Sequence, residues 1–270
     1  LILVTSTWVK EMYIRDGISG DKIEVLPVGC PTDSFIPHSN HEPKIVAVRQ
    51  QLGISEEEIM ILTIGGDAAS KGSNEVMQAL AIIDKDVPSW KYVCKVWPQP
   101  RTSLQNQFDQ DLAKKLGISE KVIYATNTIS REFMPYLMGA CDIYAAPSRL
   151  EGFGMPQVEA GACGKPVIGI RAMGMLDTLV HGETALLARV GKQIVVDSVI
   201  LGPESGYELN HLLKFDIPRT VDYRADIRDV ADGLLALMQD SDLRSVMGAA
   251  GRKRVEEHFD YIVVARRFVK

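Results

Sequence analysis

The chain has 270 residues, of which 46% are hydrophobic and 24% charged, and its formal net charge is −5. This composition excludes a largely disordered chain, because low hydrophobicity and high net charge are both absent. The acidic balance argues against a general nucleic-acid-binding protein, which would carry a basic face. The length allows one large α/β domain, or one domain together with pieces of another.

The first 43 residues predict a small unit and a linker. We expect a short buried strand over residues 1–4, a helix over 7–15 with Ser6 as its N-cap, and a strand over 23–26. Three prolines and several polar residues then mark residues 31–43 as a linker at a domain boundary. The chain begins in mid-strand without an initiator Met, so we expect a fragment of a longer protein.

From residue 44 onward, predicted helices and strands alternate. Strands are expected over 59–64, 92–96, 122–125, 143–146 and 167–170. Helices are expected over 44–52, 74–83, 104–116, 130–138 and 156–162, with Ser130 as the N-cap of the fourth. Strands that are apolar throughout indicate a parallel sheet covered on both faces, which is a doubly wound, Rossmann-like α/β fold. Ligands of such folds bind at the carboxyl ends of the strands. The alternation is lost over 189–224, a predicted insertion or flap, before three C-terminal helices.

The cysteines and the hydropathy pattern bear on the compartment. Four cysteines without a CxxC pair, Cys30, Cys94, Cys141 and Cys163, predict buried thiols in a reducing compartment. The histidines are scattered, so no metal site is expected. No apolar run reaches the roughly 18 residues needed to cross a bilayer. We therefore expect a cytoplasmic protein, with peripheral attachment at the inner membrane surface left open.

The densest chemical signal runs from residue 147 to residue 160. A strand ends, a loop with two glycines follows, and a helix starts near Pro156. Glycines let a ligand approach the backbone, and a helix start attracts anions. Glu151 in the loop and Glu159 in the first helical turn are expected to face one crevice, where carboxylates accept hydrogen bonds from vicinal hydroxyls. The alternatives are that Glu159 only complements the helix dipole and that Glu151 is a solvated loop residue.

A family resemblance rests on this string. Glu151-x7-Glu159, with Gly-Phe-Gly between the glutamates and Gly164-Lys165-Pro166-Val167 after them, resembles the signature of retaining glycosyltransferases of family 4, the "group 1" family of GT-B fold. The resemblance implies that residues 1–30 are a remnant of an N-terminal acceptor domain and 31–43 the interdomain linker. Residues 44–270 would be the donor domain, which binds the nucleotide sugar and includes the 189–224 insertion and the C-terminal helices.

The resemblance also implies roles at the 151–159 motif. Glu151 would contact the hexosyl group, and Glu159 the ribose hydroxyls. The backbone of the intervening loop would meet the sugar or the distal phosphate, through Gly152, Phe153, Gly154 and Met155.

A second glycine-rich loop spans residues 64–73. By the resemblance, Gly65, Gly66 and Lys71 would border the diphosphate, with Lys71 as its cation and glycine at position 66 where the family has arginine. The alternative for Lys71 is a solvated turn lysine. The order of Lys71 and Gly72 departs from the P-loop pattern, and the loop is not a dinucleotide-binding GxGxxG, so ATPase and dehydrogenase functions are not supported.

Weaker matches complete the predicted site. Ala125 and Thr126 would meet the nucleotide base, and Arg131 is either a contact to base or phosphate or an exposed helix arginine. Asp177 receives no role. The DxD sequence at 240–242 joins two predicted helices, so we expect Ser241 or Asp242 to be an N-cap rather than a metal ligand.

Together these features predict a retaining hexosyltransferase whose donor half is this chain. The donor would be a UDP-, GDP- or ADP-sugar, the acceptor a sugar, a lipid-linked glycan or a small molecule, and no metal would be obligatory. Glu151 and Lys71 would carry the catalysis. The alternatives are a nucleotide-sugar binding module without turnover, or another GT-B enzyme such as a sugar phosphorylase or an epimerase.

Overall fold

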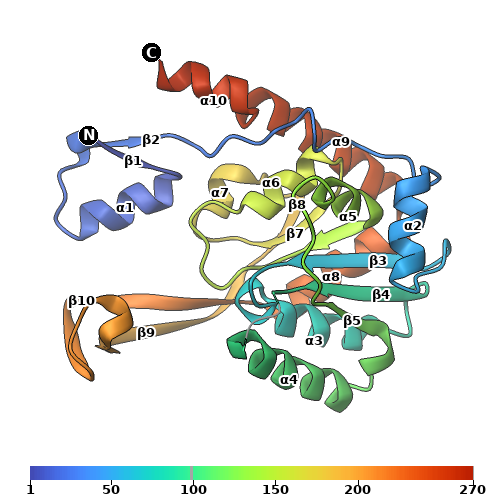
Figure 1. Cartoon of the computed structure of the whole chain (residues 1–270), viewed down its shortest axis with the longest axis horizontal. Helices are drawn as coiled ribbons and strands as arrows, with labels where there is room; N and C mark the ends of the chain where they lie inside the picture. Colours follow the sequence, from blue (N-terminus) through green and yellow to red (C-terminus); the bar gives the residue numbers. More distant parts are fainter. Residues whose placement is uncertain (98–99, 270) are drawn as a thin grey trace.

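A six-stranded parallel sheet lies at the centre of the computed structural model, which describes residues 1–97 and 100–269 (Figure 1). Its order is β5-β4-β3-β6-β7-β8. The strands are β3 (Ile59–Ile64), β4 (Trp90–Lys95), β5 (Val122–Ala125), β6 (Ile143–Ala145), β7 (Val167–Ile170) and β8 (Ala185–Ala188). Since the order reverses between β3 and β6, the loops after these two strands diverge and border the crevice where ligands of such sheets bind.

Helices cover both faces of the sheet, which confirms the predicted α/β architecture. On one face, α3 packs against both α4 and α8 (Figure 1). On the other face, α5 and α9 pack against α6, and α2 packs against α5. The bounds are α2 (Pro43–Gln51), α3 (Ser73–Ile83), α4 (Pro100–Lys115), α5 (Met134–Ala140), α6 (Met155–Ala162), α7 (Met175–Thr178), α8 (Ile227–Gln239), α9 (Ser241–His258) and α10 (Tyr261–Phe268). The central strand β3 is buried over its first five residues, as its continuous apolar sequence predicts.

The N-terminal unit consists of β1 (Ile2–Val4), α1 (Thr7–Arg15) and β2 (Ile23–Val25), with the two strands paired in parallel. Ser6 caps α1 by accepting a hydrogen bond from the Val9 amide, as expected. The expectation of a buried first strand is wrong, since within β1 only Val4 is buried and Leu3 is 46% exposed. A pair of strands with a single helix beside it offers too little surface to cover both faces.

The C-terminal helices return to this unit, and the two termini lie on the same side of the molecule (Figure 1). The Cys30 amide donates to Phe259 O, and the Tyr261 amide donates to Cys30 O, so the start of α10 is bonded to the segment after β2. Arg252 of α9 donates to the carbonyl oxygens of Thr32, Phe35 and Ala162, which fixes residues 32–35 against α6.

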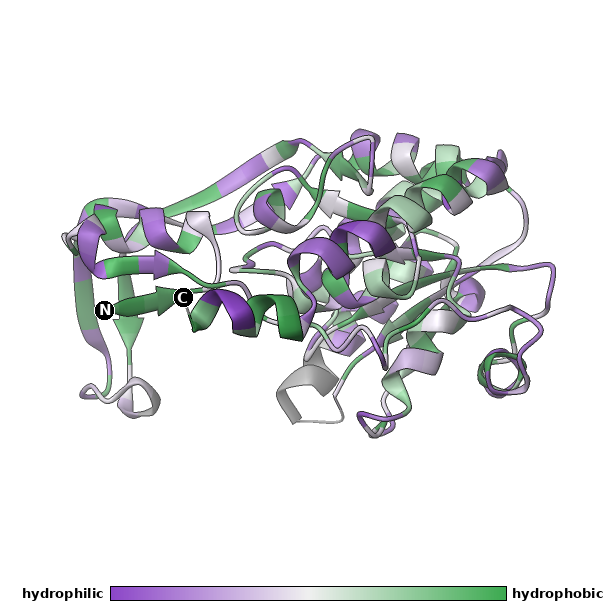
Figure 2. Cartoon of the chain, turned by 90° about the horizontal axis from the view of Figure 1, so that it is seen from above, coloured by the Kyte–Doolittle hydropathy of each residue, from purple (hydrophilic) through white to green (hydrophobic). Residues whose placement is uncertain are grey.

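Residues 190–225 form a long antiparallel hairpin of β9 (Val190–Leu201) and β10 (His211–Ala225). The hairpin extends from the sheet along the N-terminal unit, and hydrophobic and hydrophilic stretches follow one another along it (Figure 2). Arg219 of the hairpin lies 2.8 Å from Asp16 at the end of α1. The sequence indicated an interruption here but not two strands, because the register shifts in three places and charges lie on both strands.

Two predicted helix caps are wrong. Residues 131–133 form a turn and α5 begins at Met134, so Ser130 does not cap it and Phe133 occupies the N-cap position. Asp240, rather than Ser241 or Asp242, caps α9 by accepting from the Leu243 amide at 2.8 Å. The backbone turns from α8 into α9 at Asp240, so the carboxylate there is the one that reaches the first free amides.

Candidate functional site

The loop from β3 to α3 holds Lys71 at the carboxyl edge of the sheet. Lys71 ends a single 3-10 turn, η2 (Ala69–Lys71), directly before Gly72 and α3. A Cβ built on Gly65 would lie 2.6 Å from Lys71 Cγ, so the aliphatic stem of Lys71 crosses directly over that glycine. A residue larger than glycine at position 65 would therefore displace Lys71.

Gly72 brings this loop against the loop that follows β6. Its φ is +86°, and a Cβ built on it would lie 2.5 Å from Pro147 O, so the position requires glycine on both counts. One step further on, the Arg149 amide donates to Ser70 O at 2.9 Å. The two loops are thus fixed to each other through their backbones at the point where the strand order reverses.

Lys71 and Glu151 meet across this junction. The Lys71 ammonium lies 2.7 Å from Glu151 Oε2, with side-chain exposures of 22% and 15%. Partial burial strengthens such a pair relative to a surface ion pair, because less water screens it. The structure therefore brings together the two residues to which the sequence assigned catalysis, and it makes them direct partners.

The loop after Glu151 presents free amides to the same place. Gly154 is the N-cap of α6 in the left-handed conformation. Among the described residues, the amides of Gly152, Phe153, Gly154 and Met155 donate no hydrogen bond. Phe153 itself is buried, and its carbonyl oxygen accepts from the Thr178 hydroxyl. An anion at the helix start would meet these amides and the positive end of the helix dipole.

Glu159 lies in the second turn of α6, not in the first, because the helix begins at Met155. Burial raises its pKa to about 7, and the positive charge of Arg131 acts in the opposite direction. A carboxyl group beyond the first turn gains little from the helix dipole, so complementing the dipole does not explain its place. Burial raises the pKa of Tyr144, and the negative charges of Glu159 and Glu151 raise it further.

The remaining predicted residues lie around this centre. Arg131 is exposed in the turn before α5, beside a pocket of about 620 Å³ that it shares with linker residues. Ala125 ends β5, and Thr126 after it is exposed. A Cβ built on Gly66 would lie 3.5 Å from the Trp97 ring, and the Trp97 amide donates to Gly66 O. None of these residues contacts Lys71 or Glu151 directly through an ion pair or hydrogen bond within the described chain.

Arg149, for which the sequence indicated no role, joins three parts of the site. Its guanidinium donates to both carboxylate oxygens of the buried Glu75, at 3.1 and 3.2 Å. Its amide bonds to Ser70 O, and its carbonyl oxygen accepts from the Tyr223 amide of the hairpin at 2.7 Å. The available signal was Glu75 itself, an acidic residue among the apolar positions of α3.

The N-terminal unit contacts this site. A Cβ built on Gly152 would lie 3.4 Å from a methyl group of Val9 and 3.8 Å from the Thr5 hydroxyl. The Thr7 amide at the start of α1 donates to the Asp177 carboxylate. Asp177 therefore joins the two parts of the chain, a role that the sequence did not indicate.

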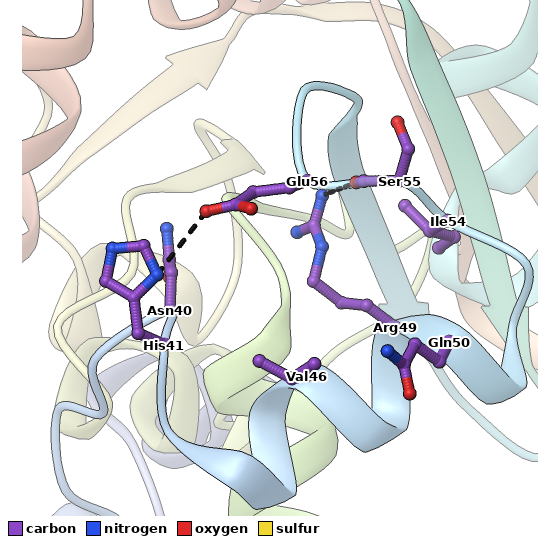
Figure 3. Close-up of a pocket in the computed structure, with 8 residues that line it drawn as sticks. All are labelled: Asn40, His41, Val46, Arg49, Gln50, Ile54, Ser55 and Glu56. Atoms are coloured by element: carbon purple, nitrogen blue, oxygen red, sulfur yellow. Dashed lines mark hydrogen bonds and ion pairs between the residues drawn. The ribbon is translucent and has the colours of Figure 1, made fainter.

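A separate pocket of about 500 Å³ lies between α2 and the segment before β3 (Figure 3). It adjoins the amino end of β3, opposite the edge that carries Lys71. Within it Arg49 already donates to four groups, which are the carbonyl oxygens of Ala140, Ser55 and Glu58 and the carboxylate of Asp142. Arg49 thus holds α2 to the sheet and is not a candidate for ligand binding.

In residues 1–97 and 100–269, no three histidine, cysteine or acidic side chains lie close enough to hold a metal ion. No helix of this part of the chain has the length and apolar character needed to cross a membrane. All four cysteines are buried and free.

Residues 45–199, more than half of the chain, match the family model described as Glycosyl transferases group 1. The chain belongs to this family. The predicted family membership is thereby confirmed.

Two curated relatives match most of this group 1 chain but less than half of their own length. D-inositol 3-phosphate glycosyltransferase of Acidothermus cellulolyticus is 28% identical over 191 residues, which cover 68% of this chain and 41% of the relative. N-acetyl-alpha-D-glucosaminyl L-malate synthase of Bacillus anthracis is 27% identical over 212 residues, covering 78% and 44%. The chain thus spans about two fifths of the length of the curated relatives it matches.

A solved structure shares the fold over the entire group 1 chain. HepE of Anabaena, in complex with UDP, superposes with a TM-score of 0.78 at 18% identity, over 100% of this chain and 62% of that one. Agreement at this identity concerns the fold alone. It extends through the N-terminal unit and the C-terminal helices as well as the sheet.

Proposed function

We propose that this chain supplies the donor-binding half of a retaining glycosyltransferase, which moves a hexosyl unit from a nucleoside diphosphate sugar to an acceptor. The observation that carries the proposal is the Lys71–Glu151 ion pair at the strand-order reversal, beside the free amides of the α6 start. Cations and amides there suit a diphosphate, and a carboxylate suits sugar hydroxyls. The UDP in the solved HepE complex is in line with such a donor.

In this proposal the chain acts mainly through electrostatics. Charge develops on the diphosphate as its bond to the sugar breaks, and the Lys71 ammonium and the amides of residues 152–155 stabilise that charge. As Lys71 turns to the phosphate, Glu151 is released to accept hydrogen bonds from the hexosyl group. The acceptor would approach on the face from which the diphosphate leaves, so no protein nucleophile is required.

The other residues would hold the nucleoside. Glu159 would accept from the ribose hydroxyls, with Arg131 near it, and Ala125 and Thr126 would lie along the base. The donor is a UDP-, GDP- or ADP-sugar, and binding would need no metal ion. The acceptor is a sugar, a lipid-linked glycan or a small molecule bound mainly by the N-terminal domain of the whole protein, which we propose to be cytoplasmic.

The proposed division of the chain follows its contacts. Residues 1–30 would belong to the acceptor domain, 31–43 to the linker and 44–270 to the donor domain. In support, residues 32–35 are held by Arg252 of α9, while α1 meets residues 44–270 chiefly at the site and at the hairpin.

A melting screen and a turnover assay test the proposal. UDP, GDP or ADP should raise the melting temperature, since a ligand at 100 times its Kd adds about 2.7 kcal/mol to stability. A protein containing this chain and its N-terminal domain should then release nucleoside diphosphate in the presence of an acceptor. Binding without any turnover would indicate a binding module, and release of sugar phosphate a phosphorylase. Conversion of the donor to its epimer would indicate an epimerase.

A further inference from the structure

Lys95 is a buried lysine at the carboxyl end of β4, and the site described above does not use it. Only 5% of the residue is exposed, and its ammonium donates to Val96 O at 2.9 Å. Among the residues that the structure describes, no carboxylate lies within ion-pair distance of it. Burial lowers its pKa, as expected for a cation that lacks a compensating charge. Such a group costs stability unless it serves a ligand.

The position of Lys95 relates it to the strand that would carry the nucleotide base. Lys95 pairs with Ile64 of β3 on one side and with Ala125 of β5 on the other. The Val96 amide donates to Ala125 O at 3.2 Å, so Val96 is bonded to β5. The amide and the carbonyl of one extended residue face the same neighbouring strand. The ammonium, which donates to the Val96 carbonyl, therefore lies on the β5 side of β4.

The diphosphate would lie on the opposite side of Lys95. Lys71 and the start of α6 follow β3 and β6, whereas Lys95 faces the end of β5. An ammonium has three N–H donors, and one of them is used by Val96. The two that remain have no acceptor among the described residues, and a neutral carbonyl oxygen of a ligand could accept from one of them.

We propose that Lys95 recognises the nucleobase of the donor by donating a hydrogen bond to its exocyclic carbonyl oxygen, O4 of uracil or O6 of guanine. Cytosine and adenine carry an amino group at the equivalent position, and that group would direct its own N–H donors at the ammonium. The inference rests on the proposed function, because it needs a nucleoside diphosphate in the site. It narrows the donor to a nucleotide whose base has a carbonyl acceptor there.

The test uses ligand pairs that differ in this group. UDP and CDP differ at the 4-position in O4 against an amino group, and GDP and ADP include the same exchange at the 6-position. Calorimetry on the unaltered chain should give at least tenfold tighter binding of UDP than of CDP, or of GDP than of ADP. Lys95→Met should reduce that ratio to less than threefold, mainly by weakening the preferred nucleotide.

A matched control is available on the same strand. Lys91 lies four residues earlier on the same face of β4, near its amino end, and donates to Glu120 O. Lys91→Met should leave both affinity ratios unchanged. Replacement of the buried ammonium by a thioether of similar length should also raise the melting temperature, which shows that Lys95→Met is folded.

The possible outcomes separate a failure of this inference from a failure of the proposed function. If the unaltered chain binds nucleoside diphosphates without preferring the carbonyl-bearing base, the inference is wrong and the proposed function stands. The same holds if Lys95→Met weakens all four nucleotides equally, which would indicate a phosphate contact. If the unaltered chain binds no nucleoside diphosphate at all, the proposed function fails and the inference fails with it.

Discussion

The Lys71 ammonium and the Glu151 carboxylate lie 2.7 Å apart, although 80 residues separate them along the chain. Each residue neutralises the other, so the positive charge of Lys71 is not available at long range. In the proposed function, a diphosphate that takes over Lys71 would leave Glu151 free to accept hydrogen bonds from the hydroxyls of a sugar. Binding of phosphate and binding of sugar would then be linked through a single pair of side chains.

Lys71→Ala should reduce the affinity for nucleoside diphosphate at least tenfold, about 1.4 kcal/mol, and leave nucleoside affinity nearly unchanged. The substitution removes a cation and also leaves the Glu151 carboxylate unpaired near the phosphates. Calorimetric titration with the diphosphate and the nucleoside measures both effects. Lys85→Ala, at an exposed lysine after α3, is the control. A Lys71→Ala protein that binds the diphosphate as tightly as the parent would remove Lys71 from the site.

Glu151→Ala and Glu159→Ala should separate sugar binding from ribose binding. Loss of a hydrogen bond to a charged acceptor costs roughly 1.5–3 kcal/mol, or about 10- to 150-fold in Kd. Glu151→Ala should impose this loss on the nucleotide sugar only, and it should not weaken the diphosphate, because Lys71 is set free. Glu159→Ala should weaken both ligands. Equal losses for both ligands in both variants would contradict the assignment.

The free energy of unfolding should decrease with rising pH because of the titration of Glu159. Burial raises its pKa in the folded chain to about 7, whereas the ordinary pKa of a glutamate side chain is 4.5. Between these values the folded state binds more protons than the unfolded state, so this contribution is fully present below about pH 4.5 and is lost as the pH rises through 7. Glu159→Gln should remove the decrease, with a gain at pH 8 over pH 4.5 on the order of 3 kcal/mol at most.

Urea unfolding at several pH values measures this difference. The exposed Glu132, in the turn beside Arg131, supplies the control variant Glu132→Gln. If Glu159→Gln and the parent show the same change in unfolding free energy between pH 4.5 and pH 8, Glu159 does not titrate as the structure indicates.

Gly72→Ala should destabilise the fold more than Gly117→Ala. Both glycines have positive φ, +86° and +75°, so each alanine costs about 1–2 kcal/mol from backbone strain. A Cβ on Gly117 would meet nothing within 4 Å, whereas one on Gly72 would strike Pro147 O. Gly72→Ala should therefore add a further loss and also weaken diphosphate binding, since the Lys71 loop must move. Similar unfolding free energies for both variants would argue against the close contact of the two loops.

Local sequence patterns were sufficient for most of the sheet and its helices. The apolar run of β3 has one stable placement, inside a parallel sheet, and Ser6 has a helix to cap. The hairpin was not predictable in this way. Its strand β10 carries the charged residues Arg219 and Asp222 and pairs with β9 through several register shifts, and Arg219 contacts Asp16 at the end of α1. A contact between residues so far apart in the chain cannot be predicted from local sequence patterns.

Candidate site residues could be named from the sequence, but their geometry could not be predicted from it. Lys71 and Glu151 were each expected near a ligand, yet their ion pair depends on β3 and β6 being neighbours in the sheet. The order of the strands in the sheet cannot be read from local sequence. Arg149 was overlooked for the same reason, since Glu75 and Tyr223 reach it from distant parts of the chain. Glu159 was assigned one turn too early because the helix begins one residue before Pro156.

The hairpin of β9 and β10 leaves and rejoins the part of the chain that holds the six-stranded sheet at a single point. Arg189 O accepts from the Asp226 amide at 2.8 Å, so one hydrogen bond joins the residue directly before the hairpin to the residue directly after it. Segments with closed ends of this kind tolerate changes of length, because the backbone on either side need not move. The tip between Leu201 and His211 is accordingly a suitable place to insert a fluorescent domain as a reporter, with the sheet and its crevice left undisturbed.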